Sequence, residues 1–428
     1  MKIYNKCKVL IKNINLEPLS FAIYLTVLIF IISYTSSNFS ITQIVCFWGN
    51  GFWALTDFTL NIAMIFLFGF IIAESQLAKG LLITVLNKAS NKHQAIFICC
   101  FITCISTLLN WSIGLVFGAN ACRFAMSKYK SINSKLLVAS VYSSFILWHG
   151  GLSGTIPLML STPGHFLESM IGGTIPTHLT LFSKFNVTIV LTILIGLPTF
   201  SYILSLLTNN GGINECDDSS SILQNSKEKK FSFSIFSLST ICFFYLANAE
   251  LNNLLLLDLN QVSFILFGLG LALHMDMQSY LNSALLGSSK IWGMIIQFPL
   301  YAGLMSIIMK TGLCEDISCF FIGKSTKETF PLYTFLSAGV VNFFIPSGGG
   351  QWVVQGPIVI KTAKELGVNI EKISMIVAWG DAWTNLIQPF WAIPLLSIVN
   401  LSVKDILGYC FVMLLFTGTI IYFIILFS

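Results

Sequence analysis

Residues 342–357 read NFFIPSGGGQWVVQGP, and this stretch interrupts an apolar run that would otherwise form one long helix. Pro346 removes a backbone donor, and glycines 348–350 leave the backbone bare and free to adopt positive φ. In hydrocarbon such an interruption is tolerated only where protein packs around it or where it lines a wet cavity. The stretch therefore predicts a re-entrant hairpin over 329–360 that enters the membrane, turns at the glycines and returns. A glycine-kinked core helix is the alternative.

The return arm of this hairpin would begin with free N–H groups and the positive end of a helix dipole, directed into the membrane interior. Such an end attracts carboxylates. Gln351 and Gln355 lie one turn apart, so both can face one cavity, although hydrogen bonding between helices is the alternative for them. The residues predicted to contact a substrate here are Ser347, Gly348, Gly349, Gly350, Gln351 and Gln355.

The whole chain has the composition of a helical protein with many membrane crossings. Of its 428 residues, 55% are hydrophobic and 10% are charged, whereas a soluble domain carries about 25% charged residues. The net charge of +5 sits in the loops, so it bears on topology and gives no sign of nucleic-acid binding. The 11 cysteines lie mostly in apolar segments, and pairing of Cys314 with Cys319 is left open. No metal-ligand spacing is recognisable, so metal binding is unknown.

A second hairpin is predicted over 95–122 from charge rather than from glycine. The flanking loops, 79–93 and 123–135, are both rich in basic residues, so both are expected in the cytoplasm. An apolar segment whose two ends lie on the same side is a re-entrant hairpin. At its tip, Asn110 and Ser112 can either close a turn or contact a ligand.

Each hairpin is followed by an interrupted helix. Residues 136–160 are broken at HGGLSGTIP (149–157), and residues 373–398 are broken at WGDAWTN (379–385). Because the two hairpins enter from opposite sides, this arrangement predicts an inverted-topology repeat, in which binding sites form near the membrane midplane.

The predicted fold is an all-α membrane protein with about nine transmembrane helices plus two re-entrant hairpins. Residues 1–207 form the N-terminal half, 208–230 a polar cytoplasmic linker, and 231–428 the C-terminal half. The N-terminus is expected in the cytoplasm and the C-terminus outside.

Asp381 is the only carboxylate well inside an apolar segment of the second half, and an acid in that position is a functional-site candidate. Thr384, Asn385 and Gln388 beside it supply neutral oxygens and amide donors, and His149, its counterpart in the first half, suits a proton relay. Asp381, Thr384, Asn385 and His149 form the predicted coupling-ion site. Structural roles are the alternative for Asp381 and His149. The predicted substrate contacts of the first half are Asn110, Ser112, Gly150, Gly151 and Ser153.

Four motifs carry a family resemblance over nearly the whole chain. PSGGGQWVVQGP (346–357) and WGDAWTNLIQPFW (379–391) resemble the short-chain fatty acid transporter family of the AtoE type, and HGGLSGTIP and QFPLYAG (297–303) look like further signatures. The resemblance implies a carrier for short-chain carboxylates such as acetoacetate or butyrate in a bacterial inner (plasma) membrane. That family is similar to a wider group of ion-coupled carriers with paired re-entrant hairpins that move by an elevator mechanism.

The expected function is secondary active transport and not enzymatic catalysis. No ATP-binding loop is present, so a gradient of Na⁺ or H⁺ would drive the carrier, with no other cofactor. The expected partners are a small carboxylate, the lipid bilayer and a second copy in a homodimer, with no nucleic acid. The alternatives are a carrier for other carboxylates such as dicarboxylates, a channel, and an intramembrane enzyme using His149 and Asp381. Paired breaks favour a carrier over an enzyme, because a catalytic site needs no second copy.

Overall fold

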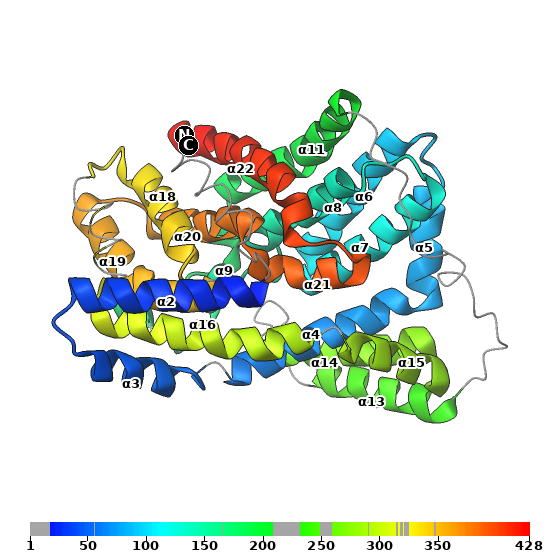
Figure 1. Cartoon of the computed structure of the whole chain (residues 1–428), viewed down its shortest axis with the longest axis horizontal. Coiled ribbons are helices and arrows are strands. Elements are labelled where there is room, and N and C mark those ends of the chain that lie inside the picture. The colour runs from blue at the N-terminus through cyan, green and yellow to red at the C-terminus, as the bar shows by residue number, and fades with distance from the viewer. Residues whose placement is uncertain are drawn as a thin grey trace, which may run out of the picture.

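The computed structural model describes residues 18–54, 56–165, 167–208, 232–248, 259–289, 291–313, 316, 320, 325–345 and 348–428, and the regular structure in them is all helical (Figure 1). The all-α class expected from composition is confirmed for this part of the chain. Three expectations lie outside the described residues: the linker from 209 onward, the Cys314–Cys319 pair, and Ser347.

One layer occupies the lower half of Figure 1. Its helices are α2 (Pro18–Ser36), α3 (Ile41–Gly51), α4 (Thr56–Glu74), α13 (Phe233–Asn248), α14 (Leu259–His274), α15 (Met277–Ser288) and α16 (Trp292–Thr311). α16 packs along α2 and α3, and α4 packs against α14 and α15. Helices from the start and the middle of the chain therefore share this layer.

The second layer, above the first in Figure 1, contains the interrupted helices. In the first half it has α5 (Gln76–Leu86), α6 (Lys92–Leu109), α7 (Trp111–Lys128), α8 (Ser134–Ser143) with η1 (Ser144–Gly150) after it, α9 (Thr155–Ser161) and α11 (Lys184–Leu207). The short helices α10 (Glu168–Ile171) and η2 (Thr177–Leu179) lie in the connection between α9 and α11. In the second half it has α18 (Phe330–Asn342), α19 (Gly348–Leu366), α20 (Ile370–Thr384), η4 (Asn385–Ile387), α21 (Pro389–Val399) and α22 (Val403–Leu426). α20 packs against η1, so the two interrupted helices meet.

Four helical stretches among the described residues are long and apolar enough to cross a membrane: Lys92–Leu109, Ser134–Ser161, Lys184–Leu207 and Val403–Leu426. The pair Thr59–Glu74 and Gln76–Leu86, bent by 66°, makes a fifth if it is one span. Inside the molecule, 89% of the Ser134–Ser161 window is buried, against 28% of the Lys184–Leu207 window. The interrupted helix of the first half therefore runs through the protein interior, whereas α11 has an apolar face free for lipid.

The expected loop over 79–93 is wrong. Ser75 ends α4 and caps α5, because its hydroxyl accepts a hydrogen bond from the N–H of Ala78. Lys79, which suggested a loop, lies in α5 and forms an ion pair with Glu74. The two helices expected within 95–122 are longer than predicted, since α6 begins at Lys92 and α7 continues to Lys128.

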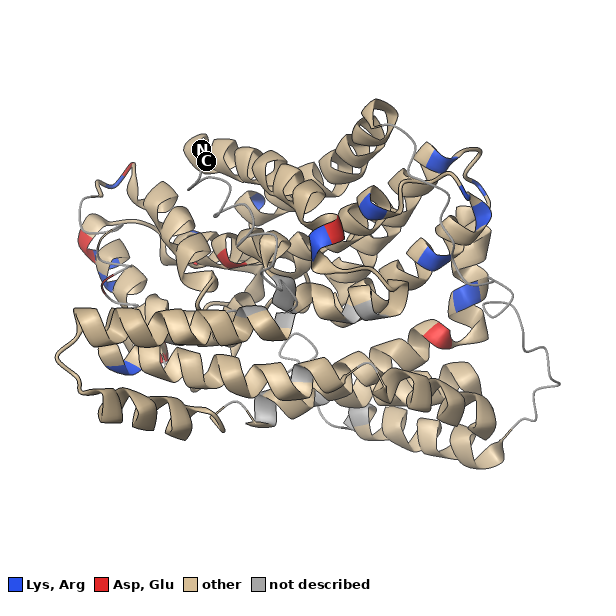
Figure 2. Cartoon of the chain, viewed as in Figure 1, with Lys and Arg blue, Asp and Glu red and all other residues tan. Residues whose placement is uncertain are grey.

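The loop before α6 and the loop after α7 lie side by side. Lys128 Nζ donates to Asn87 Oδ1 at 3.0 Å, and the Tyr129 hydroxyl donates to the carbonyl of Ala89 at 2.7 Å. Figure 2 shows Lys and Arg gathered at this end of the molecule, around the ends of α5, α6 and α7. The start of α6 and the end of α7 therefore share one basic face.

Candidate functional site

Two buried ionisable side chains from opposite halves of the chain meet inside the molecule. His149 lies in η1 and Asp381 in α20, and the distance from His149 Nε2 to Asp381 Oδ2 is 3.0 Å. Each residue is 0% exposed. Asn385 Nδ2 donates a longer hydrogen bond, 3.4 Å, to the same carboxylate oxygen. Since an unpaired buried charge is costly, the imidazole is the partner that makes the carboxylate tolerable here.

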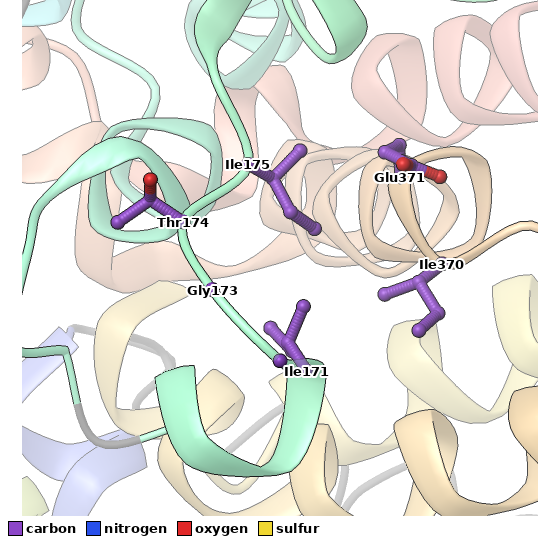
Figure 3. Close-up of a pocket in the computed structure, with 7 residues that line it drawn as sticks. Ile171, Gly173, Thr174, Ile175, Ile370 and Glu371 are labelled. Atoms are coloured by element: carbon purple, nitrogen blue, oxygen red, sulfur yellow. The ribbon is translucent and has the colours of Figure 1, made fainter.

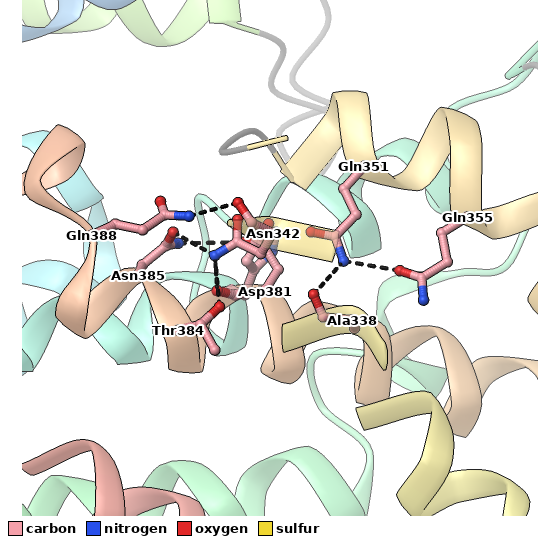
Figure 4. A network of polar contacts seen from close by, with 9 residues as sticks. Ala338, Asn342, Gln351, Gln355, Asp381, Thr384, Asn385 and Gln388 are labelled. Carbon is pink, nitrogen blue, oxygen red and sulfur yellow. Dashed lines mark hydrogen bonds and ion pairs between the residues drawn. The ribbon is translucent and has the colours of Figure 1, made fainter. Parts of the chain in front are cut away.

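A single amide, that of Asn342, joins the end of α18 to the end of α20 (Figure 4). Its Nδ2 lies 2.8 Å from the carbonyl oxygen of Asp381, 2.9 Å from Thr384 Oγ1 and 2.8 Å from Asn385 Oδ1. Gln388 Nε2 donates to the Asn342 carbonyl at 2.5 Å. The last carbonyls of a helix lack partners within the helix, so this amide supplies a donor where α20 ends.

The two glutamines of α19 bond to α18 and to each other. Gln351 Nε2 donates to the carbonyl of Ala338 and to Gln355 Oε1, both at 2.9 Å (Figure 4). Gln355 Nε2 donates to Ser337 Oγ at 2.9 Å. Gln351 and Gln355 lie on one face of α19, as expected. In this structure their amide groups form the helix–helix hydrogen bonds that were the alternative to contacting a ligand.

Tyr142 and Asn186 of the first half also form hydrogen bonds with the second half. The Tyr142 hydroxyl of α8 donates to the carbonyl of Asn385 at 2.5 Å and lies 3.1 Å from that of Gln388. Asn186 Nδ2 of α11 donates to the carbonyl of Gly150 at 3.0 Å, and Asn186 Oδ1 accepts from Trp379 Nε1 at 2.9 Å. These contacts tie both interrupted helices to their neighbours.

The residues predicted at the first break form a separate cluster around the α6–α7 connection. Asn110 caps α7, because its Oδ1 accepts from the backbone N–H and the hydroxyl of Ser112 at 2.9 and 2.7 Å. Ser153 Oγ accepts from the N–H of Trp111 at 3.1 Å. A Cβ on Gly151 would lie 2.7 Å from the Cα of Leu108, so this glycine permits a close backbone approach. The polar groups here are used to close the connection.

The prediction that the chain turns at glycines 348–350 is wrong. These residues form the first turn of α19, and positive φ is absent from them. Their value lies in the missing side chain: a Cβ on Gly348 would overlap Nε2 and Cε1 of His149. A Cβ on Gly349 would lie 3.3 Å from Thr155 Cγ2, and one on Gly150 would lie 2.6 Å from the ring of Trp379. The glycines therefore bring η1, α19 and α20 together.

Several buried polar atoms of this network have no hydrogen-bond partner among the described residues. They are His149 Nδ1, Asp381 Oδ1, Asn342 Oδ1, Gln351 Oε1 and Gln388 Oε1. Buried polar atoms without partners are uncommon, so the network retains capacity for a ligand, an ion or a proton. The described residues contain no cluster of three or more His, Cys, Asp or Glu side chains that could hold a metal ion.

A cavity of about 270 Å³ lies away from this network, between α10 and the start of α20 (Figure 3). It is lined by residues 171–175 together with Ile370 and Glu371. None of the predicted site residues lines it, and its one ionisable group, Glu371, disfavours an anionic ligand. The His149–Asp381 network is therefore the better candidate for the functional site.

Asn342, Tyr142 and Asn186 belong to the network but were given no site role from the sequence. Gln388, expected beside Asp381 as a source of oxygen and amide groups, donates to the Asn342 carbonyl. Asn342 and Asn186 could have been found as amides within or at the end of apolar helices, where a polar side chain needs a partner. Tyr142 gave no such signal, because a tyrosine is common in an apolar helix.

The chain is similar to known proteins along its full length. The model of the family described as Short chain fatty acid transporter matches residues 1–428. A curated relative from Haemophilus influenzae is 35% identical over 424 residues, and one from Escherichia coli K12 is 34% identical over 415 residues. Each alignment covers 94% of this chain and 94% of the relative, and both relatives carry the provisional name short-chain fatty acid transporter.

Two solved structures are also similar to the chain. The YdaH transporter of Alcanivorax borkumensis is 11% identical, with a TM-score of 0.48 over 95% of this chain and 97% of that chain. MtrF of Neisseria gonorrhoeae, described as illuminating a class of antimetabolite efflux pumps, is 14% identical, with a TM-score of 0.45 over 96% of this chain and 95% of that chain.

Proposed function

The chain belongs to the short-chain fatty acid transporter family, and from this premise we propose that it is a cation-coupled secondary transporter of small monocarboxylates such as acetoacetate and butyrate. The observation that carries the proposal is the match over the whole chain, because a transport site assembled from both halves needs both halves. The chain is a helical multi-pass membrane protein, and we place it in a bacterial inner membrane with its N-terminus in the cytoplasm. Transport, and not catalysis, is then its activity.

The substrate carboxylate binds, in this proposal, at the N-terminal turn of α19. A helix N-terminus favours an anion. Gly348 lies against the ring of His149, so this helix end is next to the buried pair. Gln351 Oε1, in the first two turns of the same helix, has no partner among the described residues.

The coupling cation acts at Asp381, His149, Thr384 and Asn385. Support comes from their common hydrogen-bond network, which includes the one buried carboxylate of α20. We further propose that the halves form an inverted-topology repeat with two re-entrant hairpins. The layer with the interrupted helices would then move against the other layer in an elevator cycle, in a homodimer embedded in the bilayer.

Uptake of labelled butyrate into proteoliposomes tests the proposed function. Saturable uptake that excess acetoacetate inhibits, and that protein-free vesicles lack, is the expected result. Counterflow, in which unlabelled butyrate inside drives entry of labelled butyrate, should occur without any ion gradient. Absence of both uptake and counterflow would contradict the proposal.

The same assay separates the substrate classes. Succinate in place of acetoacetate as competitor reports on dicarboxylates. If succinate inhibited butyrate uptake more strongly than acetoacetate did, the carrier would be assigned to dicarboxylates instead of monocarboxylates.

A further inference from the structure

The contact between His149 and Asp381 requires a proton. A carboxylate oxygen only accepts, so His149 Nε2 must carry the hydrogen when Asp381 is ionised; when Asp381 is protonated, its hydroxyl donates to Nε2. The 3.0 Å distance fits either arrangement. We propose that the coupling ion is a proton and that the His149–Asp381 pair carries it. This inference rests on the transport function proposed above and identifies its driving ion.

The pair can change its net charge by one unit. With neutral His149 and ionised Asp381 the pair carries −1, and uptake of one proton makes it neutral, either as an imidazolium carboxylate or as two neutral groups. The atoms free to receive that proton, His149 Nδ1 and Asp381 Oδ1, are buried and have no hydrogen-bond partner among the described residues. Histidine is the side chain whose ordinary charge change falls near neutral pH.

The geometry links this proton to the substrate. A buried site charged −1 repels a carboxylate, and the low dielectric of the interior strengthens that repulsion. Gly348, the first residue of α19, lies directly against Nε2 and Cε1 of His149. A carboxylate at this helix end would therefore sense the charge of the pair. Proton and carboxylate then favour one another's binding, which is the linkage that symport requires.

The backbone carbonyls near the two breaks favour a proton over Na⁺. Discontinuous helices bind Na⁺ through the backbone carbonyls that a break sets free. Several carbonyls near the breaks already accept hydrogen bonds among the described residues: those of Asn385 and Gln388 accept from the Tyr142 hydroxyl. The other occupied carbonyls are those of Asp381, Asn342, Gly339, Ala338, Gly150 and Leu108. Oδ2 of Asp381 is already in contact with His149 Nε2 and Asn385 Nδ2.

Few other titratable groups lie near the pair. The elements packed against η1 and α20 are α6, α7, α8, α9, α11, α18, α19, α22 and η4. Their buried titratable side chains among the described residues are Tyr142, Cys99, Cys100, Cys104, Cys122 and Cys410. Hydroxyl and thiol groups are ordinarily uncharged at neutral pH, so these side chains add no charge beside the pair. The lysines, Arg123 and the acidic residues of these helices are at least partly exposed, apart from Asp381 itself.

Accumulation driven by a pH gradient tests the inference. Proteoliposomes that are alkaline inside receive labelled butyrate, and matched vesicles receive an inward Na⁺ gradient at equal pH. Protein-free vesicles run in parallel because the undissociated acid crosses lipid unaided. Accumulation is scored as the initial rate of uptake in excess of protein-free vesicles, and we expect such an excess with the pH gradient alone. Accumulation that follows Na⁺ instead would overturn the inference.

The variants His149→Gln and Asp381→Asn are expected to lower pH-driven accumulation by about tenfold or more, and any remaining counterflow should no longer depend on pH. His93→Gln is the matched control and should behave as wild type. Nδ1 of His93 hydrogen-bonds with the hydroxyl of Ser205, and neither residue belongs to the His149–Asp381 network. If both pair variants still accumulated butyrate, the pair would not carry the proton.

A measurement on the wild-type protein does not depend on variants that fold. Adding butyrate outside the vesicles should raise the external pH beyond the change in protein-free vesicles, because each carboxylate enters with a proton. If the wild-type protein showed counterflow without this proton uptake, the proton would not be the coupling ion, but the proposed transport function would stand. If the wild-type protein showed no counterflow, the proposed transport function itself would be rejected.

Discussion

The position of the His149 imidazole depends on the missing side chain of Gly348. A methyl group there would overlap the ring atoms Nε2 and Cε1, and Nε2 is the atom that contacts Asp381. We expect Gly348→Ala to push the ring away from the carboxylate and to lower pH-driven butyrate accumulation by about tenfold or more. Overpacking of this kind costs roughly 1–3 kcal/mol, so the protein should still insert.

Gly349→Ala is the matched control for that substitution. Its Cβ would approach Thr155 Cγ2 to 3.3 Å, a contact that a small shift relieves, and it would not reach the His149–Asp381 pair. Accumulation and inserted amount are measured for both variants in the same vesicles. Equal accumulation in the two variants would show that the tight fit at Gly348 has no functional consequence.

Asp381→Asn separates the charge of this residue from its shape. The amide has nearly the shape of the carboxyl group and can still form hydrogen bonds, but it cannot carry a negative charge. Cation-driven accumulation should therefore fail. If the substrate carboxylate binds at α19, its affinity at saturating cation should fall less than accumulation does. Half-saturation of counterflow, measured against butyrate concentration, gives that affinity. An Asn variant that still concentrates substrate would make Asp381 a structural residue.

Asp381 and His149 could be selected from the sequence as candidates because ionisable residues are costly within apolar helices. Their direct contact could not, since it joins positions 149 and 381 and depends on how two interrupted helices pack. The turn predicted at glycines 348–350 was wrong for a related reason. A run such as 348–350 signals that side chains are excluded, but it does not say whether the backbone needs positive φ or a neighbour needs the space.

At the scale of elements, the interruption after α20 depends on a hydroxyl from another helix. Tyr142 of α8 donates to the carbonyl of Asn385, one of those left free where the helix ends. Tyr142→Phe leaves that buried carbonyl without its donor, which costs about 1–3 kcal/mol. We expect a lower thermal midpoint in detergent together with weaker butyrate accumulation.

Tyr333→Phe is the control for this prediction, because Tyr333 is a more exposed tyrosine on α18. Its thermal midpoint should stay at the wild-type value. A Tyr142 variant as stable as wild type would mean that water or a rearranged side chain satisfies the carbonyl.

The ends of elements could be predicted where a local side chain sets them. Asn110 ends α6 and caps α7 through its own backbone neighbours, and such signals are local in sequence. α5 was missed because Lys79 suggested a loop, although Ser75 is a helix cap and Glu74 pairs with the lysine. The donors Tyr142 and Asn186 act across the fold, so no local pattern reveals their partners.

At the scale of the whole molecule, composition is enough to predict a helical membrane protein, and the long motifs are enough to predict the family. Topology is harder, because α6 and its neighbours have the length and hydropathy of either a span or a hairpin arm. The inverted repeat therefore stays a prediction that rests on charge and on the order of breaks.

The topology of the first half can be tested at residues 88 and 128, which flank α6 and α7. Both lysines are exposed, and the two loops touch, since Lys128 bonds Asn87. The basic residues there favour the cytoplasm.

The experiment uses a background in which the other accessible cysteines, Cys46 among them, are replaced by serine. We expect Lys88→Cys and Lys128→Cys to react with an impermeant maleimide in inside-out vesicles only. Ser169→Cys, in the exposed segment after α9, should react in right-side-out vesicles and serves as the control. Labelling of positions 88 and 128 from opposite sides would eliminate the first hairpin, and labelling of both from outside would reverse the orientation of the chain.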